Sequence, residues 1–215
     1  MAVEDVLEEI AAEVRVCTKC ALCLNTKNGV PGEGSPHAEV LFIGEAPGYH
    51  EDRQGRPFVG PAGQFLNELL GSVGLDRSSV FITNVVKHRP PENRDPLPDE
   101  IAACSDYLTR QIAALNPKVI VTLGRYSMAR FFPGAKISAI HGQAKKIDGR
   151  VVVAMYHPAA ALHQQALRQT VIDDFKRSIP PALAEARRLE AEGQLSDKAT
   201  KKDDEDEPPK QLSLF

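Results

Sequence analysis

The chain has 215 residues, of which 42% are hydrophobic and 26% are charged, and its formal net charge is −3. These values are ordinary for a globular protein and exclude a wholly disordered or fibrous chain. No apolar run approaches the roughly 18 residues that cross a membrane, and the acidic N-terminus does not resemble a signal peptide, so we expect a cytoplasmic location. The body up to Ala191 is neutral, which argues against an obligate coat on DNA but allows a local basic patch.

Taken in chain order, the sequence alternates between helical patterns and short apolar runs. The apolar runs are typical of strands covered on both faces, and they are Val40–Ile43, Val80–Val86, Val119–Leu123 and Val151–Met155. Helices are predicted over residues 3–14, 62–73, 99–115, 126–132, 167–178 and 182–191. The alternation predicts one α/β domain over residues 1–191 with a mostly parallel sheet. Residues 192–210 are polar and charged, which predicts a disordered linker.

Ligands of such sheets bind beyond the carboxyl ends of the strands, so the residues that follow the predicted strands are the first candidates. The segment Gly44–Gly48 is either a tight structural turn or a close backbone approach to a ligand. Asn84, inside an apolar strand, either bonds a neighbouring loop or faces a ligand with complementary polar groups. His157 precedes Pro158 at the end of the fourth strand, and Leu162 is expected to be exposed on the loop that follows.

Basic residues gather in the two loops after the first and second predicted strands. They are Arg53, Arg56, Lys87, Arg89 and Arg94. Such a group is either an ordinary solvated surface or, where the loops converge on one rim, a track for phosphates.

Four cysteines are too few for a disulfide scaffold in a chain of this size, and two of them form the pair Cys17-x-x-Cys20. Together with Cys104 on a predicted helix, they suggest an iron–sulfur cluster or a zinc ion that joins the N-terminal segment to the domain. His88 is a further candidate ligand. Free thiols are the alternative.

Six segments, in this order, resemble the motifs of the family 4 uracil-DNA glycosylases, which are the iron–sulfur type. The segments are Gly44–Gly48, Glu51–Asp52, Gly55–Gly60, Thr83–Lys87, Arg89–Arg94 and His157–Pro158. The resemblance implies a three-layer α/β/α domain with a central four-stranded parallel sheet, a [4Fe–4S] cluster, and excision of uracil from DNA.

The resemblance also implies roles for individual residues. Phe58 would stack on the flipped uracil, Asn84 would pair with its edge, and His157 would donate to the developing negative charge at O2. Glu45 and Glu51 match acidic family positions that steer water or stabilise the sugar cation, and Gly44 and Ala46 would lie against the base. Since position 46 is Ala, the water-activating Asp of the larger family is missing.

His88 stands where family members usually carry a third cluster cysteine. We therefore expect the ligands Cys17, Cys20, His88 and Cys104, with Cys23 in place of His88 as the competing set. The insertion typical of crosslinking relatives is also absent, so we expect turnover and not a covalent trap. A non-catalytic iron–sulfur module that binds damaged DNA and a zinc-stapled hydrolase are the rival interpretations.

The last five residues, Gln211, Leu212, Ser213, Leu214 and Phe215, match the short peptide with which bacterial repair and replication proteins dock to the sliding clamp. A chance apolar C-terminus is the alternative. Two apolar anchors beside a hydrogen-bonding Gln suit a hydrophobic pocket on a partner. We expect a monomer that binds uracil-containing DNA and this clamp.

Overall fold

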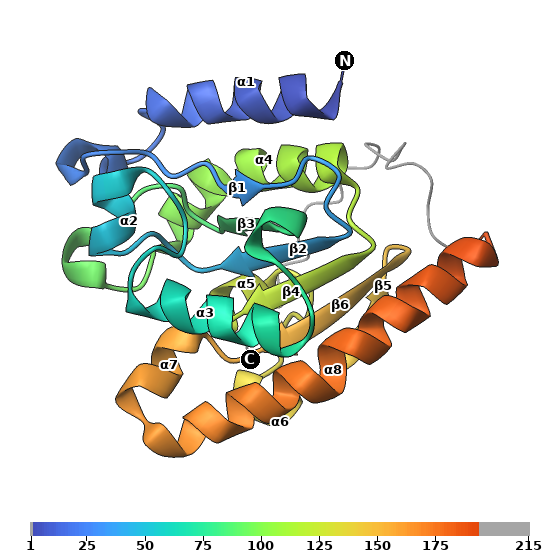
Figure 1. The fold of residues 1–215 in the computed structure, drawn as a ribbon. Helices are drawn as coiled ribbons and strands as arrows, with labels where there is room; N and C mark the ends of the chain where they lie inside the picture. The colour runs from blue at the N-terminus through green and yellow to red at the C-terminus, as the bar shows by residue number, and fades with distance from the viewer. Residues whose placement is uncertain (1, 194–215) are drawn as a thin grey trace, which may run out of the picture.

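In a computed structural model, which describes residues 2–193, six strands form one mixed sheet in the order β1-β3-β2-β4-β6-β5 (Figure 1). The four central strands run parallel to one another, and they are β3 (Phe81–Asn84), β2 (Val40–Gly44), β4 (Val119–Leu123) and β6 (Arg150–Met155). All four coincide with apolar runs of the sequence. The predicted parallel four-stranded core of the sheet is therefore confirmed.

Two antiparallel edge strands were not predicted. β1 (Glu33–Gly34) pairs with β3, and β5 (Ala144–Ile147) pairs with β6. The first has only two residues, and the second contains two consecutive lysines and is mostly exposed. Neither segment has the apolar character that marks a buried strand, because each lies at the margin of the sheet.

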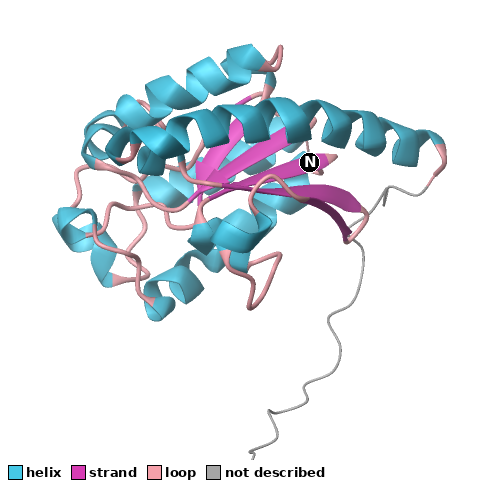
Figure 2. Ribbon diagram, turned by 90° about the horizontal axis from the view of Figure 1, so that it is seen from below, coloured by secondary structure: helices cyan, strands magenta, loops and turns pink. Residues whose placement is uncertain are grey.

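Helices cover both faces of the sheet, which gives the three layers expected (Figures 1 and 2). Alternate side chains of each strand point to opposite faces. In β2, Val40 and Phe42 join a core with α3 (Pro61–Ser72) and α8 (Gln165–Ala191). Leu41 and Ile43 join a second core with α1 (Val3–Arg15) and α4 (Pro98–Leu115).

The helix α8 replaces two predicted helices. Pro180 and Pro181 lie inside it, and a proline removes a backbone donor and crowds the preceding turn, which is why the sequence predicts a break there. The helix continues through both prolines, with Ile179 and Ala182 buried on either side of them. Burial of this apolar face in the core compensates for the hydrogen bonds that the prolines remove.

Short helical elements occupy the loops between the strands and the long helices. They are α2 (Tyr49–Gln54), α5 (Arg125–Ala129), α6 (Ile137–Ile140), α7 (Pro158–His163) and the 3₁₀ turns Ala21–Asn25, Arg77–Ser79 and Pro91–Asn93. Among the described residues, no helix is both long and apolar enough to cross a membrane. The predicted terminal peptide and the predicted linker, apart from residues 192 and 193, lie outside the described residues.

Candidate active site

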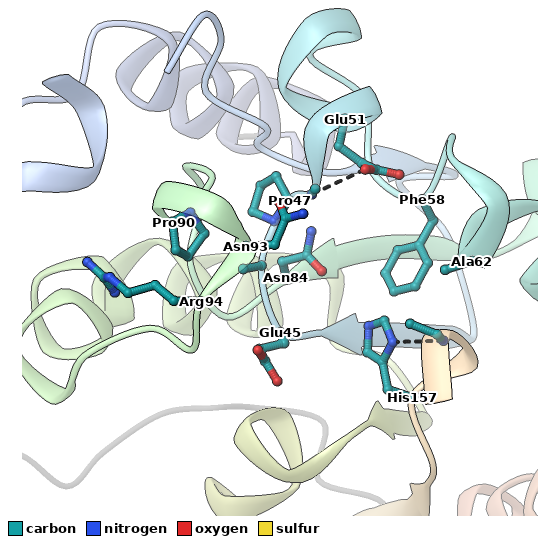
Figure 3. Close-up of a pocket in the computed structure, with 13 residues that line it drawn as sticks. Glu45, Pro47, Glu51, Phe58, Ala62, Asn84, Pro90, Asn93, Arg94 and His157 are labelled. Carbon is teal, nitrogen blue, oxygen red and sulfur yellow. Dashed lines mark hydrogen bonds between the residues drawn. The ribbon is translucent and has the colours of Figure 1, made fainter. Parts of the chain in front are cut away.

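A pocket of about 440 Å³ opens at the carboxyl edge of the parallel strands, where the sequence placed its candidates (Figure 3). Residues after β2, at the end of β3 and after β6 meet in it. The lining consists of Glu45, Ala46, Pro47, Gly48, Glu51, Phe58, Ala62, Asn84, Pro90, Asn93, Arg94, His157 and Ala159. The pocket therefore brings together both candidate glutamates, the aromatic residue, the amide and the histidine.

Asn84 ends β3, and its side chain is 1% exposed. Its Oδ1 is buried and has no hydrogen-bond partner among the described residues. An unpaired buried polar atom is costly, and natural structures rarely keep one without a purpose. Of the two alternatives for Asn84, Oδ1 does not form a hydrogen bond to a neighbouring loop. It is therefore an acceptor available to a ligand.

Gly44 makes the floor of the site possible. A Cβ at this position would lie 2.3 Å from Oδ1 of Asn84 and 2.6 Å from the ring of Phe58. Neither neighbour can move far, since both are buried. Glycine is therefore required for the amide and the aromatic ring to approach the end of β2 together.

Phe58 and His157 face each other across the pocket. Their ring centroids are 5.5 Å apart, with an angle of 25° between the ring planes. Phe58 is 6% exposed and has a positive φ of 49°, a conformation that non-glycine residues seldom adopt. Two aromatic groups beside an unpaired amide suit a flat, polar-edged ligand.

The hydrogen bonding of His157 determines its tautomer. The backbone N–H of Ala159, in the first turn of α7, donates to Nδ1 at 3.1 Å. Because Nδ1 accepts, the proton of the neutral ring is on Nε2. Burial lowers the pKa of His157 to about 4, with the charge of Glu51 acting in the opposite direction. At neutral pH His157 is thus an uncharged donor through Nε2.

Glu45 follows β2 directly and is half-buried. Its pKa is raised to about 7, mainly by burial and also by the charge of Asp95, while the charge of Arg125 acts in the opposite direction. A carboxyl group with this pKa can accept a proton at neutral pH. This property makes it a candidate general base, in a pocket where the sequence offered no Asp at position 46.

Glu51 lies in α2, and its carboxylate is fully engaged by backbone donors. The N–H groups of Val59 and Gly60 both donate to Oε1 at 2.8 Å, and the N–H of Gly48 donates to Oε2 at 3.1 Å. The side chain thus ties the loop that carries Phe58 to the turn after β2. This loop-holding function was not part of the expectation for Glu51.

The arginines expected at the rim differ in their availability. In Arg56 the guanidinium binds Glu33, and in Arg94 it binds Glu100 through both amino groups, at 2.6 and 2.9 Å. In the described part of the chain, Arg53 and Arg89 are not paired with any carboxylate. Their guanidinium groups lie 5.5 and 5.3 Å from the ring centre of Tyr49. Arg53 also donates to the Tyr49 hydroxyl and Arg89 to Asn93 Oδ1, so both have neutral partners and keep their charge available for an anionic ligand.

Lys87 does not lie on the surface, and the prediction that it contacts phosphate is wrong. The side chain is 0% exposed, and its Nζ donates to Thr83 Oγ1, the Asn84 carbonyl and Gln111 Oε1 at 2.7, 2.8 and 2.7 Å. Burial lowers its pKa to about 7. Lys87 therefore supports the strand end that carries Asn84, and it was misassigned because Gln111 comes from the distant helix α4.

Leu162 is 43% exposed, as expected, but it lies in α7 and not in a loop. It is outside the pocket lining.

Three of the cysteines occupy one neighbourhood. Cys17 and Cys20 pack against the hydrophobic core that contains Cys104, and the N–H of Lys87 donates to Cys104 Sγ at 3.3 Å. Cys23 is close to Cys20, whose carbonyl its thiol contacts at 3.2 Å. His88 is buried. This burial lowers the pKa of His88, and the charge of Asp52 acts in the opposite direction.

No three His, Cys, Asp or Glu side chains in residues 2–193 converge as the ligands of a single ion must. Thiolates of a zinc site all lie about 2.3 Å from one point. The ligands of a [4Fe–4S] cluster are spaced more widely, because each binds a different iron. The three cysteines Cys17, Cys20 and Cys104 thus lie in one neighbourhood without converging on one point.

Several residues of the site were missed at the sequence level. Pro90 and Asn93 line the pocket, and Ala62 lines it from the start of α3. The first two stand within the segment Arg89–Arg94, so a signal for them was present. Arg77 gave no signal, because it contacts the site only through backbone carbonyls of the loop that carries Phe58.

Fold and site together define an α/β protein with a pocket of aromatic and polar side chains at the carboxyl edge of its sheet. A family model for the uracil DNA glycosylase superfamily matches residues 31–177. The chain belongs to this superfamily.

Several relatives are named type-4 uracil-DNA glycosylase. The one from Sulfurisphaera tokodaii is 49% identical in an alignment of 185 positions that covers 80% of this chain and 83% of the relative. That from Archaeoglobus fulgidus is 46% identical, over 80% of this chain and 90% of its own. The Thermotoga maritima relative is 43% identical, over 81% and 94%.

Proposed function

We propose that the protein is a uracil-DNA glycosylase, which hydrolyses the bond between uracil and deoxyribose to begin repair of deaminated cytosine. The type-4 relatives at 43–49% identity support the activity. The structural observation that carries the proposal is the unpaired, buried Oδ1 of Asn84 beside an aromatic wall and a neutral histidine donor.

Asn84 accounts for the choice of base. With uracil in the pocket, Oδ1 accepts from N3–H and Nδ2 donates to O4. Cytosine presents an acceptor at N3 and a donor at N4, so both pairs become repulsive. Since Oδ1 is already removed from water, the wrong base would leave a buried group unpaired, and such mismatches discriminate strongly. The base must first leave the stack, and stacking on Phe58 offsets part of that cost.

His157 accounts for the departure of the base. When the bond between C1′ and N1 breaks, its electron pair goes to the uracil ring and develops negative charge at O2. A donor already in place there stabilises the transition state without reorganisation. Nε2–H of neutral His157 suits this role, since Nδ1 is occupied by the N–H of Ala159.

Glu45 accounts for the activation of water. The oxygen of a water molecule attacks C1′, and its proton passes to the Glu45 carboxylate. The departing uracil anion then takes a proton from solvent. Glu51 holds the loop of Phe58 while this happens, and its negative charge lies near enough to raise the pKa of His157. The negative charge of Glu51 would also stabilise the positive charge that develops on the deoxyribose when the bond to uracil breaks.

A cleavage assay tests the function. Oligonucleotides with one uracil, thymine or cytosine are incubated with the protein, then treated with alkali, which breaks the strand at abasic sites. Strand breaks only in the uracil substrate, with many turnovers per protein, are expected. Tight binding of the uracil substrate without strand breaks would show the rival, a non-catalytic damage-binding module.

We further propose a [4Fe–4S] cluster held by Cys17, Cys20, Cys104 and His88. Support comes from the shared location of the three cysteines and from the position of His88, which directly follows the residue whose N–H contacts Cys104 Sγ. The cluster would bind the N-terminal segment to α4. Cys23 is the competing fourth ligand, because it lies beside Cys20.

The remaining proposals concern partners. Arg53 and Arg89 are proposed to hold phosphates of the uracil-containing strand, with Arg56 and Arg94 in secondary positions because carboxylates already neutralise them. Leu162, exposed on α7, would contact the DNA stack. Residues 211–215 would dock to a sliding clamp through the linker 192–210. The protein would act as a cytoplasmic monomer.

A further inference from the structure

The loop between α2 and α3 holds Phe58 in a conformation that the residue would not adopt unaided. Its φ of 49° is in the left-handed region, which is unfavourable for a non-glycine residue and persists only where surrounding contacts enforce it. Some contact outside the loop must therefore fix the backbone of Phe58.

Arg77 supplies this contact from the turn before β3. Its Nη1 donates to the carbonyl of Phe58 at 3.1 Å, and its Nη2 donates to the carbonyl of Pro57. One guanidinium thus binds two consecutive carbonyls, a geometry that its planar fork allows and a lysine cannot reproduce. The Arg77 side chain is only 21% exposed.

Two neighbours fix Arg77 in turn and close the loop. Its Nε donates to Glu33 Oε1 at 3.2 Å, so the guanidinium is oriented by the edge strand β1. On the other side, the Phe58 carbonyl lies against α3 so tightly that a Cβ at Gly63 would be 1.8 Å from it. The carbonyl is therefore confined between Gly63 and Arg77.

We propose that Arg77 is a positioning residue for base recognition, which presets the ring of Phe58 to receive uracil. This inference rests on the proposed function, in which Phe58 stacks on the base. Arg77 itself lies outside the pocket lining and does not touch the substrate. Without it, the loop relaxes toward ordinary backbone angles and the ring leaves its place opposite His157.

The test compares Arg77→Met with wild type in two binding measurements. One DNA carries 2′-fluoro-2′-deoxyuridine, whose glycosidic bond resists hydrolysis, and the other carries cytosine at the same position. Loss of most of the stacking raises the Kd for the uracil analogue about tenfold in Arg77→Met. The Kd for cytosine DNA stays unchanged, because phosphate contacts do not depend on Phe58.

Two further variants make the result specific. Arg168→Met is the matched control: Arg168 is also partly buried, pairs with Glu68 and packs on the ring of Phe65, but it lies away from the pocket. It should leave both Kd values unchanged. Arg77→Lys keeps the charge but loses the two-carbonyl contact, so it should weaken binding of the analogue about threefold. If Arg77→Met does not fold, the Kd of Arg77→Lys for the uracil analogue tests the role of Arg77.

A double-mutant cycle separates this inference from the proposed function. If Arg77 acts through Phe58, Arg77→Met adds nothing to Phe58→Ala in binding of the analogue. Equal losses for the analogue and cytosine DNA, or fully additive effects, would overturn the inference alone. If Phe58→Ala does not itself weaken binding of the analogue, the proposed stacking of uracil fails.

Discussion

Two titratable residues of the pocket are shifted in opposite directions by the same cause. Burial disfavours charge, so it lowers the pKa of His157 to about 4 and raises that of Glu45 to about 7. The histidine is therefore neutral over the whole physiological range. Of these two residues only Glu45 changes its charge near neutrality, which agrees with the proposed roles of His157 as a hydrogen-bond donor and Glu45 as a proton acceptor.

The pH dependence of excision should follow Glu45. Since a base acts in its deprotonated form, the single-turnover rate rises with pH through about 7 and levels off above it. In Glu45→Gln the rate should fall by roughly 10²–10⁴ and lose this rise. Rates measured from pH 5 to 9 check the prediction, and an unchanged profile in the variant would assign the base elsewhere.

Substitution of Asn84 by Asp should impair uracil excision at neutral pH. The change replaces the donor toward O4 by a second oxygen, which repels O4 and costs more than one hydrogen bond, so a loss of at least tenfold is expected. Single-turnover excision from uracil DNA measures it. Activity within about twofold of wild type would remove Asn84 from base recognition.

At the scale of elements, one carboxylate, that of Glu51, holds the backbone N–H groups at the end of the loop from Gly55 to Gly60. Glu51→Gln keeps the size of the side chain but replaces one oxygen by an amide group that cannot accept from the backbone. The amides of Val59 and Gly60 should lose protection in hydrogen exchange, while those of β4 keep theirs. Unchanged protection at both amides would contradict a loop-holding role.

The central strands were predictable because strands that are buried on both faces consist of continuous apolar runs. The edge strand β5, with its exposed lysines, carries no such pattern. The helix α8 was predicted as two helices because proline is unfavourable inside a helix. The helix is nevertheless continuous, because its apolar face packs in the core on both sides of the prolines.

The pocket residues were predictable for a topological reason: parallel strands present their carboxyl ends at one edge. Glu45, Asn84 and His157 all follow this rule. Lys87 did not, because its burial depends on Thr83 and on Gln111 from a helix far along the chain. Arg77 could not be found, since its contacts with the loop of Phe58 are to backbone carbonyls, which any sequence provides.

At the scale of the whole molecule, the proposed cluster joins the N-terminal segment to the domain. His88→Ala should lose the visible absorbance of the cluster and Cys23→Ala should keep it. His88→Cys should keep the cluster and lower its reduction potential, because thiolate replaces imidazole. Absorbance spectra and redox titration of the purified variants test this. Loss in Cys23→Ala with retention in His88→Ala would establish the competing ligand set.

Removal of residues 211–215 should abolish binding to a bacterial sliding clamp and leave excision on short oligonucleotides unchanged. The body would keep its pocket, and only the tether that raises its local concentration at DNA would be lost. Calorimetry with a purified clamp measures the first effect, and substitution of Leu214 and Phe215 by Ala should reproduce it. Unchanged affinity after the deletion would reject the docking role.

The helix α8 runs from the pocket end of the sheet to the opposite end. The helix begins beside α7, which follows the pocket, and it runs along the sheet to the amino ends of the strands (Figure 1). There Glu190 pairs with Lys118, just before β4, and Arg187 pairs with Glu39, just before β2. We expect a partner bound directly at the end of α8 to lie at the end of the sheet opposite the pocket. Such a partner and the DNA would bind to different surfaces, so the enzyme could move along a DNA strand while it stays bound to the partner.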